Sequence, residues 1–139
     1  MSVHDLQGPA AQFYDSFDRG DIDACVAALA EDLVVIDPGM GTVHGREPFR
    51  QYLEGLKRAV PDAKAVIEHA YEVGDAVIVE ARFVGTHTGP LAGPDGEIAA
   101  TGAAIDMRFA DVSRVIGDKI VSYHTYYDQL DFLTQLGVL

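Results

Sequence analysis

Two carboxylates, Asp37 and Asp111, stand at positions where a strand would bury them. Asp37 follows Leu33 and Val35 at two-residue steps, and Asp111 follows Phe109 in the same way. Because alternate residues of a strand point to one side, both carboxyls are expected on faces that are otherwise apolar. Burial disfavours the charged form of a carboxyl and raises its pKa, which suits a general acid or base near neutral pH. The sequence therefore predicts acid–base chemistry at these two aspartates.

Each candidate also has a purely structural explanation. Asp37 precedes Pro38-Gly39 and is suited to capping that turn with its carboxylate. Asp111 is suited to a β-bulge or to a sheet rim in contact with water. His87 shares the apolar parity of its expected strand but lies near a loop, so it is either a hydrogen-bond donor in a pocket or an ordinary histidine at a strand end. The residues alone leave these alternatives open.

The elements that position these residues follow from the hydrophobic period. Apolar residues at helical spacing predict helices over about residues 3–19, 21–30 and 48–60. The period then changes to 2. Strands are expected at 33–37 and, after the third helix, over about 63–74, 75–88, 98–115 and 118–128. Helices followed by long antiparallel strands indicate an α+β fold, and no linker divides residues 1–139 into more than one domain.

A curved sheet packed over helices leaves a cavity between the two layers, where small ligands usually bind. Tyr123 and Tyr127 share the inward face of the last strand and are suited to donate hydrogen bonds into it. The other side chains expected to contact a substrate are Tyr14, Met40, Tyr52, Phe83, Met107, Phe109 and Thr125. The loop from Gly89 to Glu97 is rich in Gly and Pro and is the candidate lid.

The composition excludes several classes of function. With 10 Lys+Arg against 22 Asp+Glu, the chain of 139 residues has a formal net charge of −12, which argues against binding to nucleic acid or to an anionic membrane. We find neither an apolar run long enough to span a membrane nor the pattern of a signal peptide. The single cysteine cannot form an internal disulfide, so a cytoplasmic protein is expected. The five histidines lack the paired spacing of a metal site, and neither a metal nor another cofactor is expected.

Six short stretches, in order over nearly the whole chain, carry a family resemblance. They are Phe17-Asp18-Arg19-Gly20-Asp21, Asp37-Pro38-Gly39, Val60-Pro61-Asp62, Gly85-Thr86-His87-Thr88-Gly89, Gly117-Asp118-Lys119-Ile120-Val121 and Gln135-Leu136-Gly137. Through them the chain resembles the SnoaL-like polyketide cyclases, within the nuclear-transport-factor-2-like superfamily. The resemblance implies a cone-shaped α+β barrel, with three N-terminal helices packed against a curved, largely antiparallel sheet and often dimeric. It also implies acid–base chemistry without a cofactor on polyketide-like or other small apolar carbonyl compounds.

Residue by residue, the catalytic aspartate of the cyclases corresponds to Thr125 and its partner histidine to Asp111. Ketosteroid isomerase, of the same superfamily, has a base that is similar in placement to Asp37 and an oxyanion-binding aspartic acid that is similar in placement to Asp111. The helix tyrosine of the isomerase corresponds to Phe13, one position before Tyr14. Small polyether epoxide hydrolases of this fold also use an acidic residue at the Asp37 position. The resemblance therefore implies related chemistry on an unidentified substrate.

Two hypotheses from different classes remain. In the first, the protein is an enzyme for a hydrophobic polyketide- or steroid-like substrate. Asp37 is its general base, and a protonated Asp111 donates a hydrogen bond to the oxyanion, assisted by Tyr127, Tyr123 or His87. Cyclisation, double-bond isomerisation and epoxide opening are all compatible with this arrangement.

In the second hypothesis the same cone is a non-catalytic binding or dimerisation module, and Asp37 and Asp111 face solvent or pair with Arg side chains. A homodimer is a separate expectation. It rests on Ile78, Val84 and Tyr126, which fall on the outward face of the sheet among charged residues.

Overall fold

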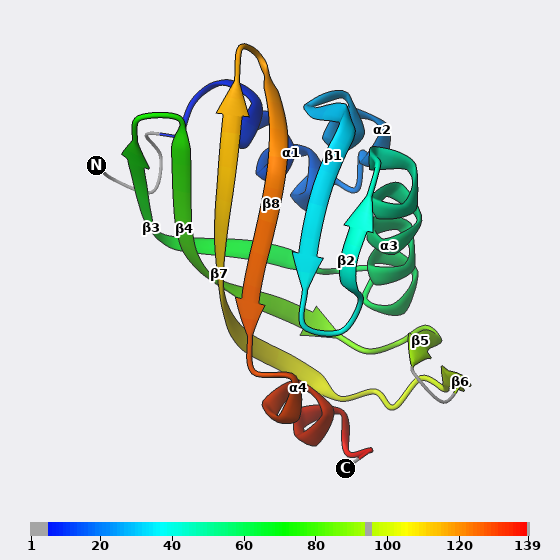
Figure 1. Cartoon of the computed structure of the whole chain (residues 1–139). Helices are drawn as coiled ribbons and strands as arrows, with labels where there is room; N and C mark the ends of the chain where they lie inside the picture. The colour runs from blue at the N-terminus through cyan, green and yellow to red at the C-terminus, as the bar shows by residue number, and fades with distance from the viewer. Residues whose placement is uncertain (1–5, 94–95, 139) are drawn as a thin grey trace.

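A curved six-stranded sheet forms the body of the protein in a computed structural model, which describes residues 6–93 and 96–138 (Figure 1). The strands lie side by side in the order β2-β1-β8-β7-β4-β3. Their bounds are β1 (Leu29–Asp37), β2 (Gly41–His44), β3 (Lys64–Val73), β4 (Ala76–Thr86), β7 (Ala104–Ile116) and β8 (Lys119–Tyr127). Neighbouring strands are antiparallel apart from β1 and β8, which are parallel. A separate hairpin consists of β5 (Leu91–Gly93) and β6 (Gly96–Ile98).

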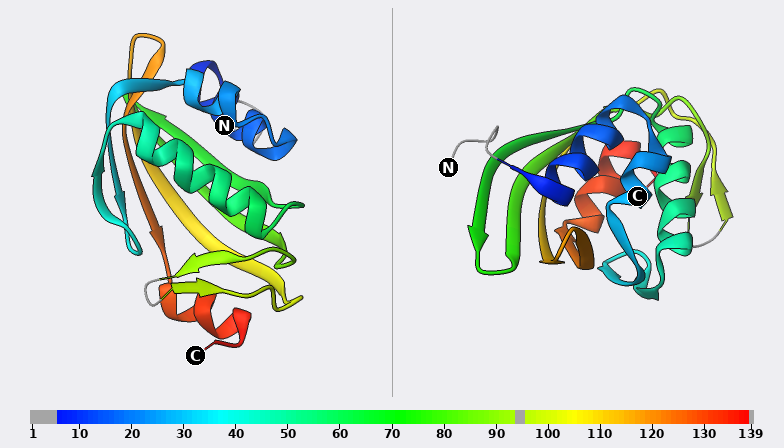
Figure 2. Two further views of the ribbon diagram at one scale, coloured as in Figure 1. Left: turned by 90° about the vertical axis from the view of Figure 1, so that its right-hand side faces the viewer. Right: turned by 90° about the horizontal axis from the view of Figure 1, so that it is seen from above.

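The helices of the described chain are α1 (Gly8–Arg19), α2 (Ile22–Ala27), α3 (Arg46–Ala59) and α4 (Gln129–Leu136). Helix α1 ends at Gly20, whose φ of 76° lets its N–H donate to the carbonyl of Phe17. Asp21 then caps α2 by accepting a hydrogen bond from the N–H of Ala24. The first three helices lie within the curve of the sheet, and α4 lies at its far end (Figure 2). None of these helices is long and apolar enough to cross a bilayer.

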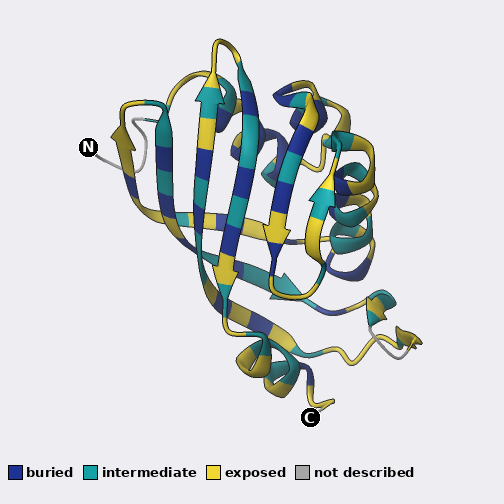
Figure 3. Cartoon of the chain, viewed as in Figure 1, coloured by how far each residue is buried: buried dark blue, intermediate teal, exposed yellow. Residues whose placement is uncertain are grey.

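The hydrophobic core lies between these helices and the concave face of the sheet. Burial alternates along the long strands (Figure 3). In β4, for example, Val79 and Ala81 are 1% and 2% exposed, whereas Glu80 between them faces solvent. Across the core, the rings of Phe13 on α1 and Phe49 on α3 stack with their centroids 6.1 Å apart. The inward face of the sheet is thus covered largely by aromatic side chains of the helices.

The predicted α+β fold is confirmed, with three N-terminal helices packed on a curved, largely antiparallel sheet. Some boundaries differ from the expected ones. The second helix ends at Ala27 because Leu29 already pairs with Ile120 in the sheet. The strand expected from residue 98 begins at Ala104, since the preceding residues form a loop in which Gly102 has a φ of 73°. The first helix begins at Gly8, and residues 3–5 of its expected range lie outside the described residues.

Three elements have no counterpart in the sequence-based prediction: β2, the β5–β6 hairpin and α4. The hairpin occupies much of the candidate lid, of which residues 94–95 lie outside the described part of the chain. Helix α4 packs against β7. It therefore lies at the far end of the sheet, where the sequence analysis expected no element (Figure 2).

The end of β4 passes closely over the end of α3. A side chain at Gly89 would overlap the carbonyl oxygen of Arg58, and the Gly89 N–H donates a 3.0 Å hydrogen bond to the carbonyl of Ala59. The Asp62 carboxylate accepts hydrogen bonds of 2.8 and 3.1 Å from the N–H and the hydroxyl of Thr86. These contacts hold α3, and with it one wall of the interior, against the sheet.

Candidate active site

A cavity of about 90 Å³ opens between α1, α3 and the inward face of the sheet. All six phenylalanines of the protein and four of its six tyrosines line it. These aromatic residues are Phe13, Phe17, Phe49, Phe83, Phe109, Phe132, Tyr14, Tyr52, Tyr123 and Tyr127. The remaining lining residues are Asp37, Leu53, Leu56, Ala65, Met107 and Thr125. Asp37 is therefore the one ionisable carboxyl among the described residues that line the cavity.

Asp37 lies at the end of β1 and is 3% exposed. Its Oδ1 accepts three hydrogen bonds: from the N–H of Gly39 at 2.7 Å, from the N–H of Met40 at 3.1 Å and from the hydroxyl of Tyr127 at 3.3 Å. Its Oδ2 has only the hydroxyl of Tyr52, at 3.5 Å. Asp37 thus caps its turn, as the structural explanation expected, and lines the cavity at the same time. Oδ2 is the oxygen that remains available for a ligand or a proton.

Asp111 lies on β7 and is 0% exposed. The hydroxyls of Tyr14 and Tyr123 each donate a 2.6 Å hydrogen bond to its Oδ2, and Oδ1 has no polar partner. Burial raises the pKa of Asp111 to about 6, although the two tyrosine hydrogen bonds act in the opposite direction. The alternative of a water-exposed sheet rim is wrong. Asp111 does not line the cavity, and its carboxyl is connected to it through the two tyrosines.

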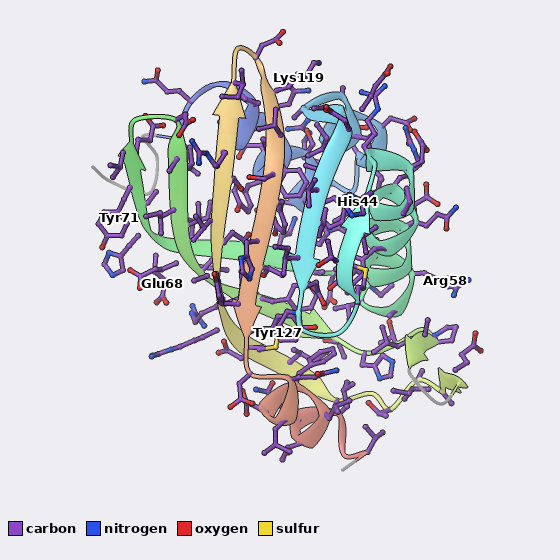
Figure 4. All side chains as sticks on the ribbon, viewed as in Figure 1. His44, Arg58, Glu68, Tyr71, Lys119 and Tyr127 are labelled. Atoms are coloured by element: carbon purple, nitrogen blue, oxygen red, sulfur yellow. The ribbon has the colours of Figure 1, made fainter. Side chains whose placement is uncertain are left out.

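The tyrosines of the cavity remain protonated at neutral pH. Burial raises the pKa of Tyr14, Tyr123 and Tyr52 well above the ordinary value, and the neighbouring carboxylates raise it further. Burial also raises the pKa of Tyr127. Tyr127 lies at the end of β8 next to α4, and its ring meets that of Phe132 edge-on (Figure 4). The four hydroxyls are therefore neutral hydrogen-bond donors.

Besides Asp111, two of the predicted site residues do not line the cavity. His87 is 0% exposed but lies beyond the cavity, because the end of β4 continues over α3. Its Nδ1 accepts a hydrogen bond from the N–H of Thr101 and lies 2.9 Å from the Thr101 hydroxyl, which supports the strand-end explanation. Met40 meets Asp37 through its backbone N–H, and its side chain packs against the core outside the lining. For these two residues the geometry of the cavity gives the predicted contact with a substrate no support.

The other predicted contact residues do line the cavity. They are Tyr14, Tyr52, Phe83, Met107, Phe109, Tyr123 and Thr125, together with Asp37 and Tyr127 from the predicted catalytic set. The sequence analysis missed the phenylalanines of the helices as part of the lining. Phe13, Phe17 and Phe49 stood on recognised apolar helix faces, and that signal was available. Phe132 had no such signal, since α4 was not predicted.

The ionisable side chains described in the cavity lining include a carboxyl but no basic group. Among the described residues that line it there is no Lys, Arg or His, and none of the described ion pairs involves Asp37 or Asp111. Within the same residues, no group of three or more His, Cys, Asp or Glu side chains has the arrangement to hold a metal ion. The groups that line the cavity can therefore accept and donate protons and hydrogen bonds around a largely apolar ligand.

The model of the SnoaL-like polyketide cyclase family matches residues 9–136. No curated protein is similar enough in sequence to count as a relative. Among solved structures, a Jannaschia sp. CCS1 protein assigned to the SnoaL-like polyketide cyclases superposes with a TM-score of 0.82 at 19% identity, over 94% of this chain and 90% of that one. At this identity the likeness shows the fold alone.

Two further structures extend the comparison. IdmH from Streptomyces antibioticus, to which polyketide cyclase activity is ascribed, superposes with a TM-score of 0.78 at 27% identity, over 94% of this chain and 96% of that one. An LEH-like epoxide hydrolase of M. tuberculosis superposes with a TM-score of 0.70 at 20% identity, over 92% of this chain and 86% of that one. The same cone therefore occurs in proteins with different ascribed reactions.

Proposed function

The chain belongs to the SnoaL-like polyketide cyclase family, and from this we propose that it is an enzyme that moves a proton on a small hydrophobic carbonyl substrate held in the aromatic cavity. Asp37 is the general base of the proposed reaction, and no cofactor takes part in it. Ring closure and double-bond isomerisation begin when the base removes a C–H proton beside the carbonyl. Epoxide opening, the alternative for an epoxide substrate, begins when the same base removes a proton from water.

One observation carries the proposal: Asp37 is a buried carboxylate whose two oxygens have different numbers of hydrogen-bond donors. Three donors hold Oδ1 in place, whereas Oδ2 has a single long contact. A carboxylate that merely capped a turn would need no place in the lining of an apolar cavity. The hypothesis of a non-catalytic module expected both aspartates to face solvent or to pair with Arg, and their burial argues against it.

The proposed step accounts for every proton. Oδ2 of Asp37 takes the proton from a C–H beside the carbonyl of the substrate, the C–H electron pair forms a C=C bond, and the carbonyl oxygen becomes an oxyanion. Asp37 is then neutral and attracts hydrogen-bond donors less strongly. Tyr52 and Tyr127, which donate to Asp37 in the resting state, become free to donate to the oxyanion. Thr125, at the place of the cyclases' aspartate, has no group that ionises near neutral pH, so the base is Asp37.

The test is deuterium exchange of the α-protons of 2-tetralone in D₂O, followed by NMR. We expect the wild-type protein to accelerate exchange and Asp37→Asn to be slower by about 10²-fold or more. Asp118→Asn, which removes an exposed carboxylate from the turn before β8, is the matched control and should exchange like the wild type.

Two results would contradict the proposal. The first is an Asp37→Asn variant that exchanges 2-tetralone as fast as the wild type. The second is a wild-type protein that accelerates neither this exchange nor the hydrolysis of styrene oxide; the non-catalytic module would then be the better explanation.

A further inference from the structure

The four tyrosine hydroxyls of the cavity all donate to two carboxyls. The hydroxyls of Tyr14 and Tyr123 donate to Asp111, and those of Tyr52 and Tyr127 donate to Asp37. A phenol hydroxyl has one hydrogen to donate and two lone pairs to accept with. Toward a ligand, these four residues therefore present oxygen lone pairs.

One end of the cavity combines these acceptors with aromatic faces. The ring of Phe13 lies 5.2 Å from that of Tyr14 and 5.5 Å from that of Tyr123, and the ring of Phe49 lies 5.1 Å from that of Tyr123. Behind the two tyrosine hydroxyls lies the Asp111 carboxyl, which has an unpartnered oxygen and no ion pair among the described residues. Aromatic faces and oxygen lone pairs both attract cations. An anion in the same place would meet carboxyls and lone pairs with no compensating charge.

The lining already accommodates a cation on its outer side. The ammonium of Lys57 lies 4.5 Å from the centre of the Phe17 ring, where it donates a 2.6 Å hydrogen bond to the carbonyl of Ala63. Lys57 does not line the cavity, so its charge does not neutralise the Asp111 end. One aromatic ring of the lining thus already contacts a cation of the protein itself.

We propose that the substrate is a hydrophobic amine, whose ammonium group binds within the cage of Phe13, Tyr14, Phe49 and Tyr123 in front of Asp111. The ammonium donates to the two tyrosine oxygens, and its charge compensates the buried carboxylate behind them. The acidic C–H or the epoxide lies at the other end, at Oδ2 of Asp37. This inference rests on the proposed function for the identity of the site, but it concerns binding and does not require turnover.

The test compares three probes of one shape by calorimetry at about pH 7.5, where the amine is protonated and the acid ionised. They are 2-naphthylmethylamine, 2-naphthylmethanol and 2-naphthoate. We expect the amine to bind about tenfold more tightly than the alcohol, and the carboxylate to bind more weakly than either. A carboxylate that bound as tightly as the amine, or an amine no tighter than the alcohol, would overturn the proposal without any variant.

Variants of the protein test whether the bound ammonium lies in front of Asp111. Asp111→Asn should bring the affinities for amine and alcohol to within about twofold of each other while the alcohol binds as before, because Asn keeps an acceptor but carries no charge. The control Asp118→Asn, which removes an exposed carboxylate far from the lining, should keep the preference. An unchanged preference in a folded Asp111→Asn protein contradicts the proposal.

A measurement on the wild type covers the case in which Asp111→Asn does not fold. The titratable groups that face Asp111 are Tyr14 on α1, Tyr123 on β8 and Asp37 on β1. Because the tyrosines stay neutral, the preference for the amine should weaken when the pH falls from about 7.5 to 5 and Asp111 gains its proton. A preference that does not change over this range would contradict the placement at Asp111.

The two proposals fail separately. If the protein accelerates exchange of 2-tetralone but shows no preference for the amine, the proposal of an amine substrate is refuted and the proposed enzyme activity stands. If the amine binds tightly but no exchange is observed, the proposed catalytic role of Asp37 is refuted and the proposed cation site stands.

Discussion

At the scale of the residue, Asp111 is subject to two opposing effects. Two tyrosine hydroxyls donate to its Oδ2, which favours the ionised form, and complete burial favours the neutral form. Burial is the larger effect, so the pKa rises from 3.8 to about 6. The native protein therefore binds this proton more tightly than the unfolded chain does. The contribution of Asp111 to stability is fully present below about pH 4 and is lost as the pH rises through about 6.

Asp111→Asn makes this contribution measurable. An amide does not titrate, so the wild type should lose stability relative to the variant by roughly 2 kcal/mol between pH 4 and pH 7.5. Urea unfolding of both proteins across this range gives the difference, in which the titration of all other groups cancels. A difference that is independent of pH would mean that water reaches the Asp111 carboxyl in the native state.

Much at this scale was predictable from alternation along the strands. The inward direction of Asp37, Asp111 and Tyr123 followed from two-residue steps, and their burial confirms it. The partners of Asp111 did not follow, because Tyr14 lies 97 residues away in the chain and only the packing of α1 on the sheet brings it close. The burial of His87 was also correctly indicated by its parity. Alternation along a strand predicts which face of the sheet a side chain lies on. It does not predict how far along the strand the residue lies from the cavity.

At the scale of the element, the prediction worked for long periodic segments and failed for short ones. Helix α3 and strands β3, β4 and β8 lie within a few residues of their expected positions. Strand β2 has four residues, too few for a period to stand out. Helix α4 had ordinary boundary signals: Asp128 caps its start by accepting from the N–H of Asp131, and Gly137 ends it with a φ of 75°. These signals were sufficient to predict α4, and with it Phe132.

The close approach of the chain after β4 to the end of α3 leads to a prediction about stability. Gly89→Ala should destabilise the protein by about 1–3 kcal/mol or more, because the new Cβ would overlap the backbone carbonyl of Arg58, which cannot move without unwinding the end of α3. Gly55→Ala, within α3, is the matched control. A Cβ there meets no atom within 4 Å, and alanine is the better helix former, so stability should be unchanged or slightly higher.

Thermal unfolding of the two alanine variants beside the wild type provides the measurement. Equal stability of Gly89→Ala and the wild type would show that the strand and the helix do not approach this closely in solution.

At the scale of the whole molecule, the outer face of the sheet carries a row of apolar and aromatic side chains. Strand pairing places them side by side across five strands, in the order Ile36, His124, Val112, Ile78 and Tyr71. Ile36 and Tyr71 are 39% and 47% exposed, and Tyr71 projects from the edge strand β3 (Figure 4). Tyr126, 50% exposed, lies in the neighbouring row. A continuous exposed row of this kind on a rigid sheet is suited to a second copy of the chain.

We therefore propose a homodimer through this face. Val112→Glu places a charge at the centre of the row and should convert the protein to a monomer without unfolding it, since the side chain points outward. Val138→Glu, which adds the same charge at an exposed position after α4, should leave the dimer intact. Sedimentation velocity at micromolar concentration distinguishes these states. A wild-type protein that is entirely monomeric under these conditions refutes the proposal.

The parallel pairing of β1 with β8 also means that the cavity can form only late in synthesis, after β8 has left the ribosome. Helix α1 and strand β1 leave the ribosome long before β8, and Tyr14 precedes its partner Asp111 by 97 residues. Until β8 has emerged, the phenylalanines of α1 and α3 have no finished sheet to cover them. Contacts of such long sequence separation form slowly, and exposed aromatic surface in a nascent chain invites aggregation. The residues that give this protein its cavity are therefore also the ones that stay uncovered longest in its nascent chain.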